Sequence, residues 1–202
     1  AMGAVGDPVA VTARLAELAS HYHLVSPATS CDGLPEGCGV AVSLVHVDLS
    51  QEAKEVYSVG DRQALSGSTL DRIAGAAGLS WDPLRSGRLD DGRDPHYCHF
   101  RAVGTVRNFD GSERTVSGEV EIDARDGSPQ IEEIVAKAKS ARGGPRDPSL
   151  QIRELRKFLL RHAESKARNR AIACMGVRRS YAPAELRKPF AVARLMWTGQ
   201  TS

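Results

Sequence analysis

The sequence is poor in aromatic residues and in cysteine, and it contains no long apolar run. Phe, Trp and Tyr account for 5% of the 202 residues, so we expect most of them in the core. Four cysteines without an export signal do not make the dense set of a disulfide-stabilised scaffold. No segment has the roughly 20 apolar residues of a membrane-spanning helix, and the start "AMGAVGDPVAV" lacks the basic and apolar regions of a signal peptide. These absences predict a protein of a reducing, cytoplasmic compartment.

Several enzyme motifs are also missing. The sequence has no glycine-rich phosphate loop, and no Ser-His-Asp or Cys-His arrangement stands out. The motifs therefore indicate no nucleotide-dependent or nucleophilic chemistry, and we expect no cofactor.

Charge is distributed unevenly along the chain. From residue 140 onwards there are 14 Lys and Arg against 4 Asp and Glu, a net charge of +10. The first 139 residues hold the other 13 cations and 21 carboxylates, a net charge of −8, so the formal total of +2 hides the asymmetry. A basic segment of this kind indicates a polyanionic partner. Nucleic acid is favoured over a membrane because no aromatic-anchored amphipathic face accompanies the charge.

Hydrophobic periodicity and turn residues predict the elements of an α+β fold. "GDPVAVTARLAELASHYHLV" is typical of a helix with Asp7 as its N-cap and Pro8 in its first turn. "VAVSLVHVDL" predicts a strand over 40–49, and "KEVYSV" predicts a strand that pairs with it. A helix is expected from Ser68, its proposed N-cap, to a stop at Gly78.

The second half of the chain predicts a hairpin and two further helices. Two β-type runs joined at Asp110-Gly111, a dipeptide suited to tight turns, predict a hairpin over 96–123. A short helix is expected over 130–139, followed by a Gly/Pro/Arg-rich loop. A long helix is then expected from Ser149, its proposed N-cap, to Gly176.

The fold expected from these elements is an antiparallel hairpin or meander sheet packed by the long basic helix. A chain of 202 residues suits one domain, 1–202. Within it we expect an N-terminal helix in 1–25, the sheet with its inserted helix in 38–125, and the long helix over 149–176. The tail, 177–202, is expected to pack across the sheet or onto a neighbouring protomer, because leaving its large apolar side chains in water would be unfavourable. These side chains are Tyr181, Phe190, Val192, Leu195 and Trp197.

The long helix combines an apolar stripe with cationic rows. The stripe recurs at every fourth residue and is expected to face the sheet; it comprises Leu155, Leu159, Ala163, Ala167, Ala171 and Met175. One row of cations, Arg153, Lys157 and Arg161, continues loosely to Arg168. Lys166 and Arg170 form a further pair four residues apart.

These cationic rows have two interpretations. A solvated helix face is the simpler one, since charged runs usually serve solubility. Like charges at this spacing repel by a few tenths of a kcal/mol per pair, however, unless an anion lies along them. A bound phosphate backbone removes that repulsion and releases counterions, so binding is expected to weaken steeply with salt.

The helix and hairpin together resemble a known family. "HAESKARNRAIACMGVRRSYAPAELRKPF", placed after "FRAVGTVRNFDGSERTVSGEVEIDARDGS", resembles the single-strand DNA annealing proteins of phage recombination systems, the RecT and Red-beta type, and their eukaryotic recombination-mediator relative. In that superfamily a hairpin with a DG-type turn precedes a helix of the form A-x-x-K/D-x-x-x-R-A-L/I-x-x-x-G. The matching residues here are Lys166, Arg170, Ala171, Ile172 and Gly176, and the resemblance covers about 65–190.

The resemblance implies a function and an assembly. It implies a β-β-β-α core whose protomers form homo-oligomeric rings or filaments around single-stranded DNA. It implies that Arg170 contacts the DNA backbone with Lys166 and Arg168 close by, although Asn169 and Ala173 replace two cations of the eukaryotic relative. The implied activity is ATP-independent strand annealing in homologous recombination, without a catalytic group. A single-strand-binding protein or a companion exonuclease is then an expected partner, in a bacterial host cell.

Further side chains are candidates for the same DNA groove. On the hairpin, Arg101, Arg107 and Arg114 are placed to extend it, and Arg107, beside the turn, is the strongest of them. Stacking on bases is an optional contribution, for which the candidates are Tyr97, Phe100, Phe109 and Trp81.

Two possible metal sites are alternatives to the DNA-binding interpretation. Glu119, Glu121 and Asp123 alternate along one strand and so share a face, the kind of carboxylate group that Mg²⁺-dependent nucleases use. The competing interpretation of this face is solvation or salt bridges. The second is a zinc site formed by Cys31, Cys38, His96 and Cys98. The Cys-x₆-Cys spacing of Cys31 and Cys38 exceeds that of zinc knuckles. A nucleic-acid-binding module without annealing activity is the third functional alternative.

Overall fold

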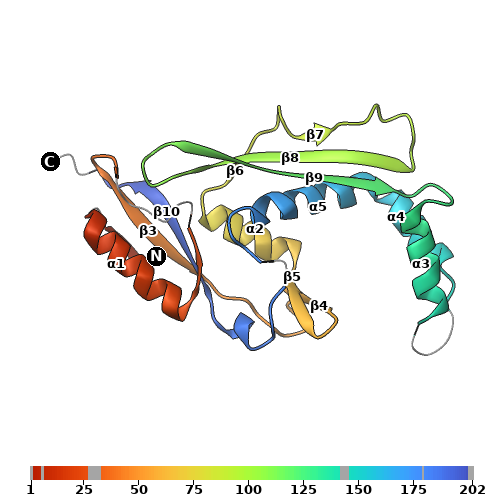
Figure 1. Ribbon diagram of the computed structural model, residues 1–202, viewed down its shortest axis with the longest axis horizontal. Helices are drawn as coiled ribbons and strands as arrows, with labels where there is room; N and C mark the ends of the chain where they lie inside the picture. The colour runs from red at the N-terminus through yellow and green to blue at the C-terminus, as the bar shows by residue number, and fades with distance from the viewer. Residues whose placement is uncertain (1, 6, 27–32, 142–145, 179, 200–202) are drawn as a thin grey trace. The chain divides into compact units, whose positions relative to one another are not determined.

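The expected mixture of helices and mostly antiparallel strands is confirmed in the computed structural model of the protein (Figure 1). The structure describes residues 2–5, 7–26, 33–141, 146–178 and 180–199. The chain divides into two compact units: unit 1 contains 1–81, 104–116 and 172–202, and unit 2 contains 82–103 and 117–171. Within the described ranges, no helix combines the length and the apolar character that crossing a bilayer requires.

Unit 1 is built on a four-stranded sheet with the order β1-β3-β10-β2. Its strands are β1 (Met2–Val5), β2 (His23–Val25), β3 (Cys38–Val45) and β10 (Phe190–Trp197). β10 pairs antiparallel with β3 along its whole length and parallel with β2. The expected packing tail is therefore a central strand, which explains why both faces of its first half are buried. Trp197, at the end of β10, remains 64% exposed.

Helices contact both sides of this sheet. α1 (Pro8–His21) begins where expected, because the Asp7 carboxylate accepts the N–H groups of Val9 and Ala10. Its apolar side chains form a core with strand residues: Val11, Leu15, Leu18, Val40, Val42, Phe109, Ala191 and Ala193. α2 (Gly67–Ala76) contacts β10 and β3, and Figure 1 shows it across the sheet from α1.

Two local predictions in unit 1 are corrected. The N-cap of α2 is Ser66 rather than Ser68, since the Ser66 hydroxyl accepts the N–H of Thr69 at 3.4 Å. The strand expected to pair with β3 is β4 (Val56–Val59), which instead pairs with β5 (Arg62–Leu65). The cause is the two-residue turn between them, where Gly60 has a φ of +63° and closes a local hairpin.

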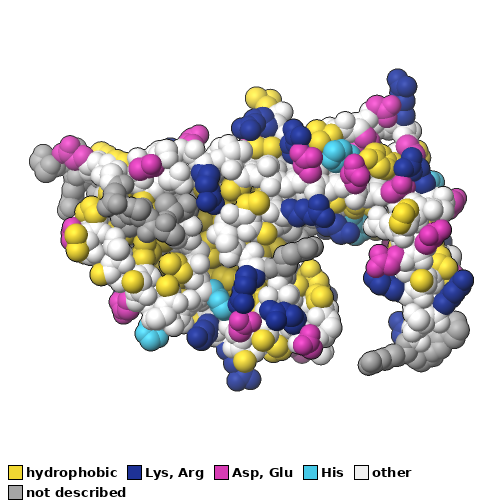
Figure 2. Space-filling model, viewed as in Figure 1, with side chains coloured by type: hydrophobic (Ala, Val, Ile, Leu, Met, Phe, Trp, Pro, Cys, Tyr) yellow, Lys and Arg dark blue, Asp and Glu magenta, His cyan; other side chains and the backbone are white. Residues whose placement is uncertain are grey.

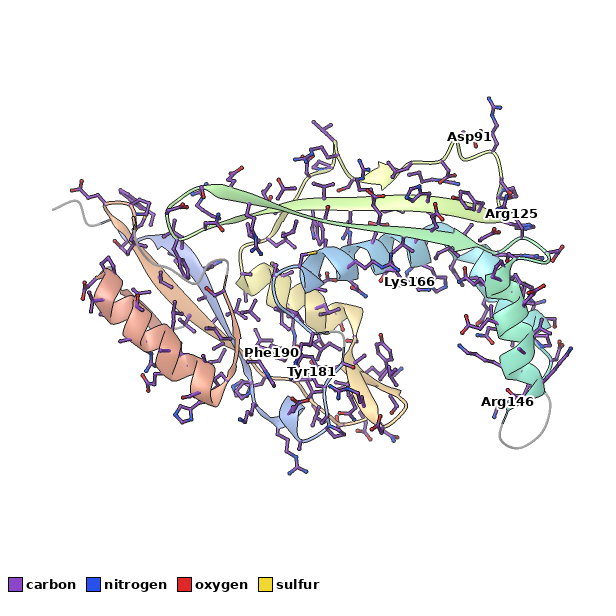
Figure 3. The ribbon with its side chains drawn as sticks, viewed as in Figure 1. Asp91, Arg125, Arg146, Lys166, Tyr181 and Phe190 are labelled. Atoms are coloured by element: carbon purple, nitrogen blue, oxygen red, sulfur yellow. The ribbon has the colours of Figure 1, made fainter. Side chains whose placement is uncertain are left out.

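The segment between α5 and β10 packs through aromatic rings. Tyr181 is buried, and its ring meets the ring of Phe190 edge-on at a centroid distance of 5.6 Å (Figure 3). The ring of His23 also meets it edge-on, at 5.1 Å. The Tyr181 hydroxyl accepts the N–H of Arg178, and its backbone bridges Gln63. The short 3-10 helix η1 (Glu185–Arg187) follows before β10 begins. These contacts bury inside the chain part of the apolar surface expected at an oligomer contact.

The predicted hairpin is confirmed as β8 (Tyr97–Arg107) and β9 (Glu113–Asp123). Asn108 donates its N–H to the Ser112 carbonyl at one end, and Ala124 donates to the His96 carbonyl at the other, at 2.8 and 2.7 Å. Both bonds belong to the same register, so the two long strands pair without a net slip. In an antiparallel ladder every second residue bonds to the partner strand. Here the even-numbered residues of β9 bond to β8, and the odd-numbered residues direct their backbone N–H and C=O groups to the edge of β9 away from β8.

The second edge of β8 is closed by the preceding segment. β6 (Ser80–Trp81) and β7 (Gly87–Arg88) pair with β8. In unit 2 the Asp90 carboxylate accepts the N–H of His99 at 2.8 Å and that of Gly92 at 3.1 Å, and it pairs with Arg88. The hydrogen bond from Arg88, followed by these backbone donors, lowers the pKa of Asp90 to about 2. Asp90 therefore acts as an ionised cap on the edge of β8.

The helices of the second half of the chain that follow the hairpin are α3 (Pro129–Lys139), α4 (Ser149–Lys157) and α5 (Leu159–Ala173). Figure 1 shows α5 running along the β8–β9 hairpin. The predicted apolar stripe is confirmed from its second residue onwards, because Leu159, Ala163, Ala167, Ala171 and Met175 are all buried. Small side chains on this stripe allow the helix backbone to approach the strand closely.

The approach of α5 to β9 is closest at Gly118. A Cβ atom added to Gly118 would lie 2.3 Å from the Ala167 carbonyl oxygen and 2.7 Å from the Ala171 nitrogen. Both of these are backbone atoms, which cannot move aside as a side chain can. Glycine is therefore the residue that the contact between α5 and β9 requires at this position.

The single long helix expected over 149–176 is wrong, because the chain leaves helical geometry at Phe158. Its φ and ψ are −113° and 24°, and the N-cap of α4 is Pro148, without a side-chain cap. The buried stripe begins only after Phe158: Leu155, on α4, is half-buried, whereas Leu159, the first residue of α5, is buried. Arg156 holds α4 by donating to the Ala124 carbonyl at 2.9 Å. Gly176, with a φ of +92°, ends the region as expected.

Replacing Gly118 by alanine tests the contact between α5 and β9. We expect Gly118→Ala to lower the free energy of unfolding by about 3 kcal/mol or more, because the methyl group overlaps helix backbone. Gly75→Ala is the matched control: its added Cβ meets nothing within 4 Å, and alanine is favoured in a helix, so stability is expected to stay the same or rise by up to about 1 kcal/mol. Equal urea midpoints for wild type and Gly118→Ala would contradict the contact.

The low pKa of Asp90 predicts a defined acid dependence of stability. Because the folded-state pKa lies below the unfolded value of about 4, the stabilisation is complete above about pH 4 and is lost as the pH falls towards about 2. Asp90→Asn is expected to lower the free energy of unfolding by about 1 to 2 kcal/mol at pH 7, with a difference that shrinks between pH 4 and pH 2. Urea unfolding across this range measures it. Asp91→Asn, on an exposed neighbour, is expected to change stability by less than about 0.5 kcal/mol throughout, and a constant deficit for Asp90→Asn would contradict the assignment.

Candidate nucleic-acid interface

In addition to Arg170, whose guanidinium bonds to β9, four of the predicted DNA-binding cations are exposed on α4 and α5: Arg153, Lys157, Arg161 and Lys166. Among the residues that the structure describes, none of them forms a salt bridge with a carboxylate. Figure 2 shows Lys and Arg side chains over α5, whereas cations and carboxylates are mixed over α3. We call these four residues the basic surface.

The basic surface does not form the straight row that the sequence suggested. The break at Phe158 separates Arg153 and Lys157, on α4, from Arg161 and Lys166, on α5. Five residues along a helix turn the side chain by roughly 140°, so Arg161 and Lys166 lie on different sides of α5. Two faces of unit 2 can therefore meet phosphate groups, with α5 between them.

The other two predicted cations of the helix have structural partners. Arg168 pairs with Glu164, one turn earlier, at 2.8 Å. Arg170 donates to the backbone carbonyl of Glu119, an odd-numbered residue of β9 whose carbonyl lies on the edge away from β8. Arg170 therefore joins α5 to the edge of the hairpin. A bound phosphate would compete with these contacts rather than find the guanidinium groups unoccupied.

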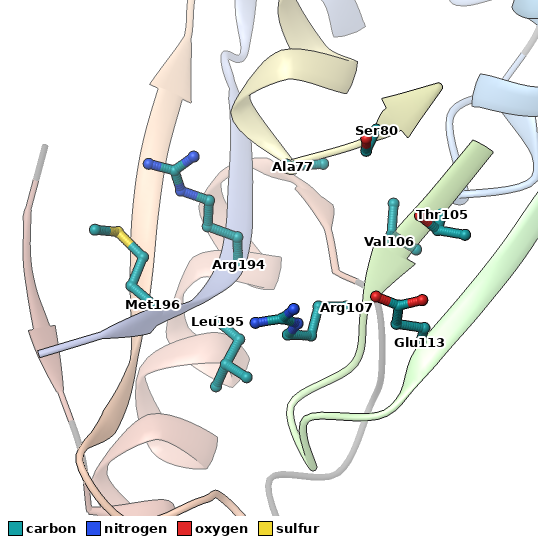
Figure 4. A pocket seen from close by; sticks show the side chains of 10 residues that line it. Ala77, Ser80, Thr105, Val106, Arg107, Glu113, Arg194, Leu195 and Met196 are labelled. Atoms are coloured by element: carbon teal, nitrogen blue, oxygen red, sulfur yellow. The ribbon is translucent and has the colours of Figure 1, made fainter. Parts of the chain in front are cut away.

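Arg107 is exposed, but it belongs to unit 1 and not to the unit that carries the basic surface. It lines a cavity of about 390 Å³ together with Thr105, Glu113 and Arg194 (Figure 4). The Nε atom of Arg194 is buried and has no hydrogen-bond partner within the described part of the chain. The expectation that Arg107 extends the helix groove stays a prediction.

The aromatic candidates for base stacking are mostly unsuitable. Phe100 and Phe109 are buried in the core, as expected for most of the aromatic residues, and so are not available to stack on bases. Tyr97 and Trp81 are half-buried, and the guanidinium of Arg125 lies 5.0 Å from the Tyr97 ring centroid. Phe158, which the sequence analysis did not select, is 39% exposed. Its position off the every-fourth stripe and directly after Lys157 is the feature that could have identified it.

The acidic face of β9 is confirmed, and its carboxylates have cationic neighbours. Glu119 and Glu121 are exposed, while Val120 and Ile122 between and after them are buried. Arg101 donates to Glu119 at 2.6 Å and thereby lowers the pKa of that carboxyl group. His99 lies 3.4 Å from Glu119 and 3.8 Å from Glu121.

The third member of this face is held in the same way. Arg125 donates to the Asp123 carboxylate at 2.8 and 2.6 Å, and this hydrogen bonding lowers the pKa of Asp123. Salt bridges, the competing interpretation of the face, are therefore observed at Glu119 and Asp123. Within the described ranges, no group of three or more His, Cys, Asp or Glu side chains is placed to hold a metal ion.

The residues proposed for zinc are not brought together. Cys31 lies outside the described residues. Cys38 is in unit 1, whereas His96 and Cys98 are in unit 2. Cys98 is buried, and burial raises the pKa of its thiol, which disfavours the thiolate that zinc binds.

No family model, curated protein or solved structure matches this chain. The resemblance to annealing proteins stays a prediction from the quoted motifs.

The two cations of the family motif are expected to behave differently when each is replaced. Arg170→Ala is expected to lower the free energy of unfolding by about 1 kcal/mol or more, because it removes the charged donor to the Glu119 carbonyl. Lys166→Ala is expected to leave stability within about 0.5 kcal/mol of the wild type, since Lys166 is exposed. Thermal and urea unfolding of both variants measure the difference. Two variants of equal stability would show that the bond from Arg170 does not hold the helix to the strand.

Proposed function

We propose that this protein binds single-stranded DNA through the basic surface of α4 and α5 and promotes the pairing of complementary strands without ATP. The observation that carries the proposal is that Arg153, Lys157, Arg161 and Lys166 are exposed and form no salt bridge among the described residues. The charge of Lys166 contributes weakly to lowering the pKa of Glu133, whose carboxylate is bound by Lys137. Elsewhere in unit 2, exposed cations such as Arg85, Arg93, Arg125 and Lys137 pair with nearby acids. The basic surface therefore retains positive charge outside salt bridges, which a polyanion can neutralise.

Electrostatics explain why a phosphate backbone suits this surface. Each cation that neutralises a phosphate releases a condensed counterion, which favours binding at low salt. The cations stand on helices whose backbone is fixed by the packing of α5 on β9 and by the bonds from Arg156, on α4, to the Ala124 carbonyl and the Asp126 carboxylate. Little ordering of the protein backbone is then needed on binding, which limits the entropic cost.

Strand annealing requires no catalytic group. A surface that binds one strand by its phosphates leaves the Watson–Crick edges of the bases exposed, and the free energy of duplex formation drives the pairing. Neutralised phosphates also reduce the repulsion between the approaching strands. The reaction proposed for this chain is therefore promotion of an encounter rather than a covalent step.

An assembly of several protomers is part of the proposal. The basic surface has few cations, and a homo-oligomeric ring or filament would repeat it along a continuous strand, raising the total affinity by multivalency. A single-strand-binding protein or a companion exonuclease in the same bacterial cell would supply the strand on which such an assembly acts.

The salt dependence of binding tests which side chains meet the phosphates. We expect Arg161→Gln/Lys166→Gln to reduce the slope of log K against log salt by about 1.4, at about 0.7 per lost phosphate contact. Arg85→Gln/Arg93→Gln is the matched control, because it removes two exposed cations from the same unit. Figure 3 shows Asp91, in the loop that carries Arg93, and Lys166 on opposite sides of the hairpin. Fluorescence anisotropy with a labelled oligonucleotide measures both slopes, and equal reductions would mean that only net charge matters.

Annealing itself is measured with two complementary fluorescent oligonucleotides, without ATP and with or without Mg²⁺. The proposal predicts faster pairing with the wild type and with the control variant, and slower pairing with Arg161→Gln/Lys166→Gln. Binding without faster pairing would indicate a nucleic-acid-binding module that does not anneal strands. Cleavage of the strands in Mg²⁺ would indicate a nuclease that uses the acidic face of β9. Either outcome would contradict the proposed annealing activity.

A further inference from the structure

The junction between α4 and α5 places an aromatic ring inside the basic surface. Phe158 leaves helical geometry there, and 39% of its surface is exposed although it is a large apolar side chain. Leu159, the next residue, is buried and continues the stripe that packs on the hairpin. At the break, neither chain neighbour of the buried Leu159 is thus itself buried, and the adjacent Phe158 ring is partly exposed to solvent.

Cationic and aromatic side chains surround this ring. The ammonium group of Lys157 lies 5.0 Å from the centroid of the Phe158 ring, within the range of a cation–π contact. The ring of His162 meets it edge-on, at a centroid distance of 6.4 Å and an interplanar angle of 87°. Arg161, four residues after Lys157 and across the break, is exposed. We call Phe158, Lys157 and His162 the junction cluster.

The junction cluster is unlike the other exposed apolar residues of unit 2. A single exposed apolar side chain needs no explanation in itself, and Leu84 is an example on an exposed loop. Phe158 differs because its ring is contacted by a cation and lies among cations without carboxylate partners in the described part of the chain. An aromatic face flanked by positive charge matches the chemistry of a nucleotide, whose flat base stacks while its phosphate meets a cation.

We propose that the junction cluster is a nucleobase-binding site in which one base of a single strand stacks on the ring of Phe158. This inference rests on the proposed function, and it adds a stacking contact to a surface otherwise argued from charge alone. Arg153 and Arg161, on the two sides of the break, are exposed cations that can meet the phosphates flanking the stacked base, whereas the nearer Arg156 is bound to Asp126 and to the Ala124 carbonyl. His162 borders the ring edge-on and so limits how the base can lie.

The site has consequences for the choice of nucleic acid. Bases in a duplex are stacked on one another and offer no free face, so the contact favours single strands over duplex. Every base has a π-face, so it tolerates any sequence. Because stacking releases no counterions, it adds affinity without changing the salt slope.

The test compares Phe158→Leu, which keeps an apolar side chain, with Phe158→Trp, which keeps an aromatic face. Binding of a fluorescent single strand and of the matching duplex is measured by anisotropy across a range of salt concentrations. A single strand with 2-aminopurine reports stacking through quenching of its fluorescence. Phe158→Leu is expected to weaken single-strand binding about tenfold or more, to reduce the quenching, and to leave both the salt slope and duplex binding unchanged. Phe158→Trp is expected to retain single-strand affinity.

Failure of this inference is distinguishable from failure of the proposed function. If Phe158→Leu binds single strands as tightly as the wild type while Arg161→Gln/Lys166→Gln does not, the base-binding site is refuted and the phosphate-binding surface stands. A wild type that binds no single-stranded DNA refutes both. If Phe158→Leu also lowers the urea midpoint and the salt slope, Phe158 serves to shape the junction and not to stack on a base.

Discussion

The structure of unit 2 depends on the close approach of α5 to β9 at Gly118. Helix backbone occupies the space where any other residue would place its Cβ atom. Alanines at every fourth position of α5 make this approach possible, and Arg170 fastens the same helix to the edge of β9. The cations that remain exposed are presented by a helix whose position is determined by backbone contact, as a surface for rigid recognition requires.

The break at Phe158 shapes the candidate interface. The apolar stripe that packs on the hairpin is buried from Leu159 onwards, whereas no side chain of α4 is fully buried. The break places Arg153 and Lys157 on a separate helix and leaves the Phe158 ring partly exposed. A local change in backbone geometry thus produces a surface that combines charge with an aromatic ring.

Local patterns predicted much of the fold, and distant pairings were missed. The hairpin was predictable because its alternation and the Asp110-Gly111 turn are adjacent in sequence, and the α5 stripe because it repeats within one helix. β10 was mistaken for a packing tail because its partner β3 lies about 150 residues earlier, and nothing local specifies that pairing. In the candidate site, the exposure of Arg161 and Lys166 was predictable from periodicity. The Arg170 bond to β9 and the exposure of Phe158 depend on tertiary contacts that a sequence pattern does not contain.

The most direct test of the account is to map where single-stranded DNA touches the protein. An oligonucleotide substituted with bromodeoxyuridine is cross-linked to the full chain by ultraviolet light, and the linked peptides are identified by mass spectrometry. The account predicts cross-links in peptides of α4 and α5 around Phe158, which decrease when salt is raised. Cross-links confined to unit 1, for example beside Arg107 and Arg194, or spread evenly over the chain, would contradict it.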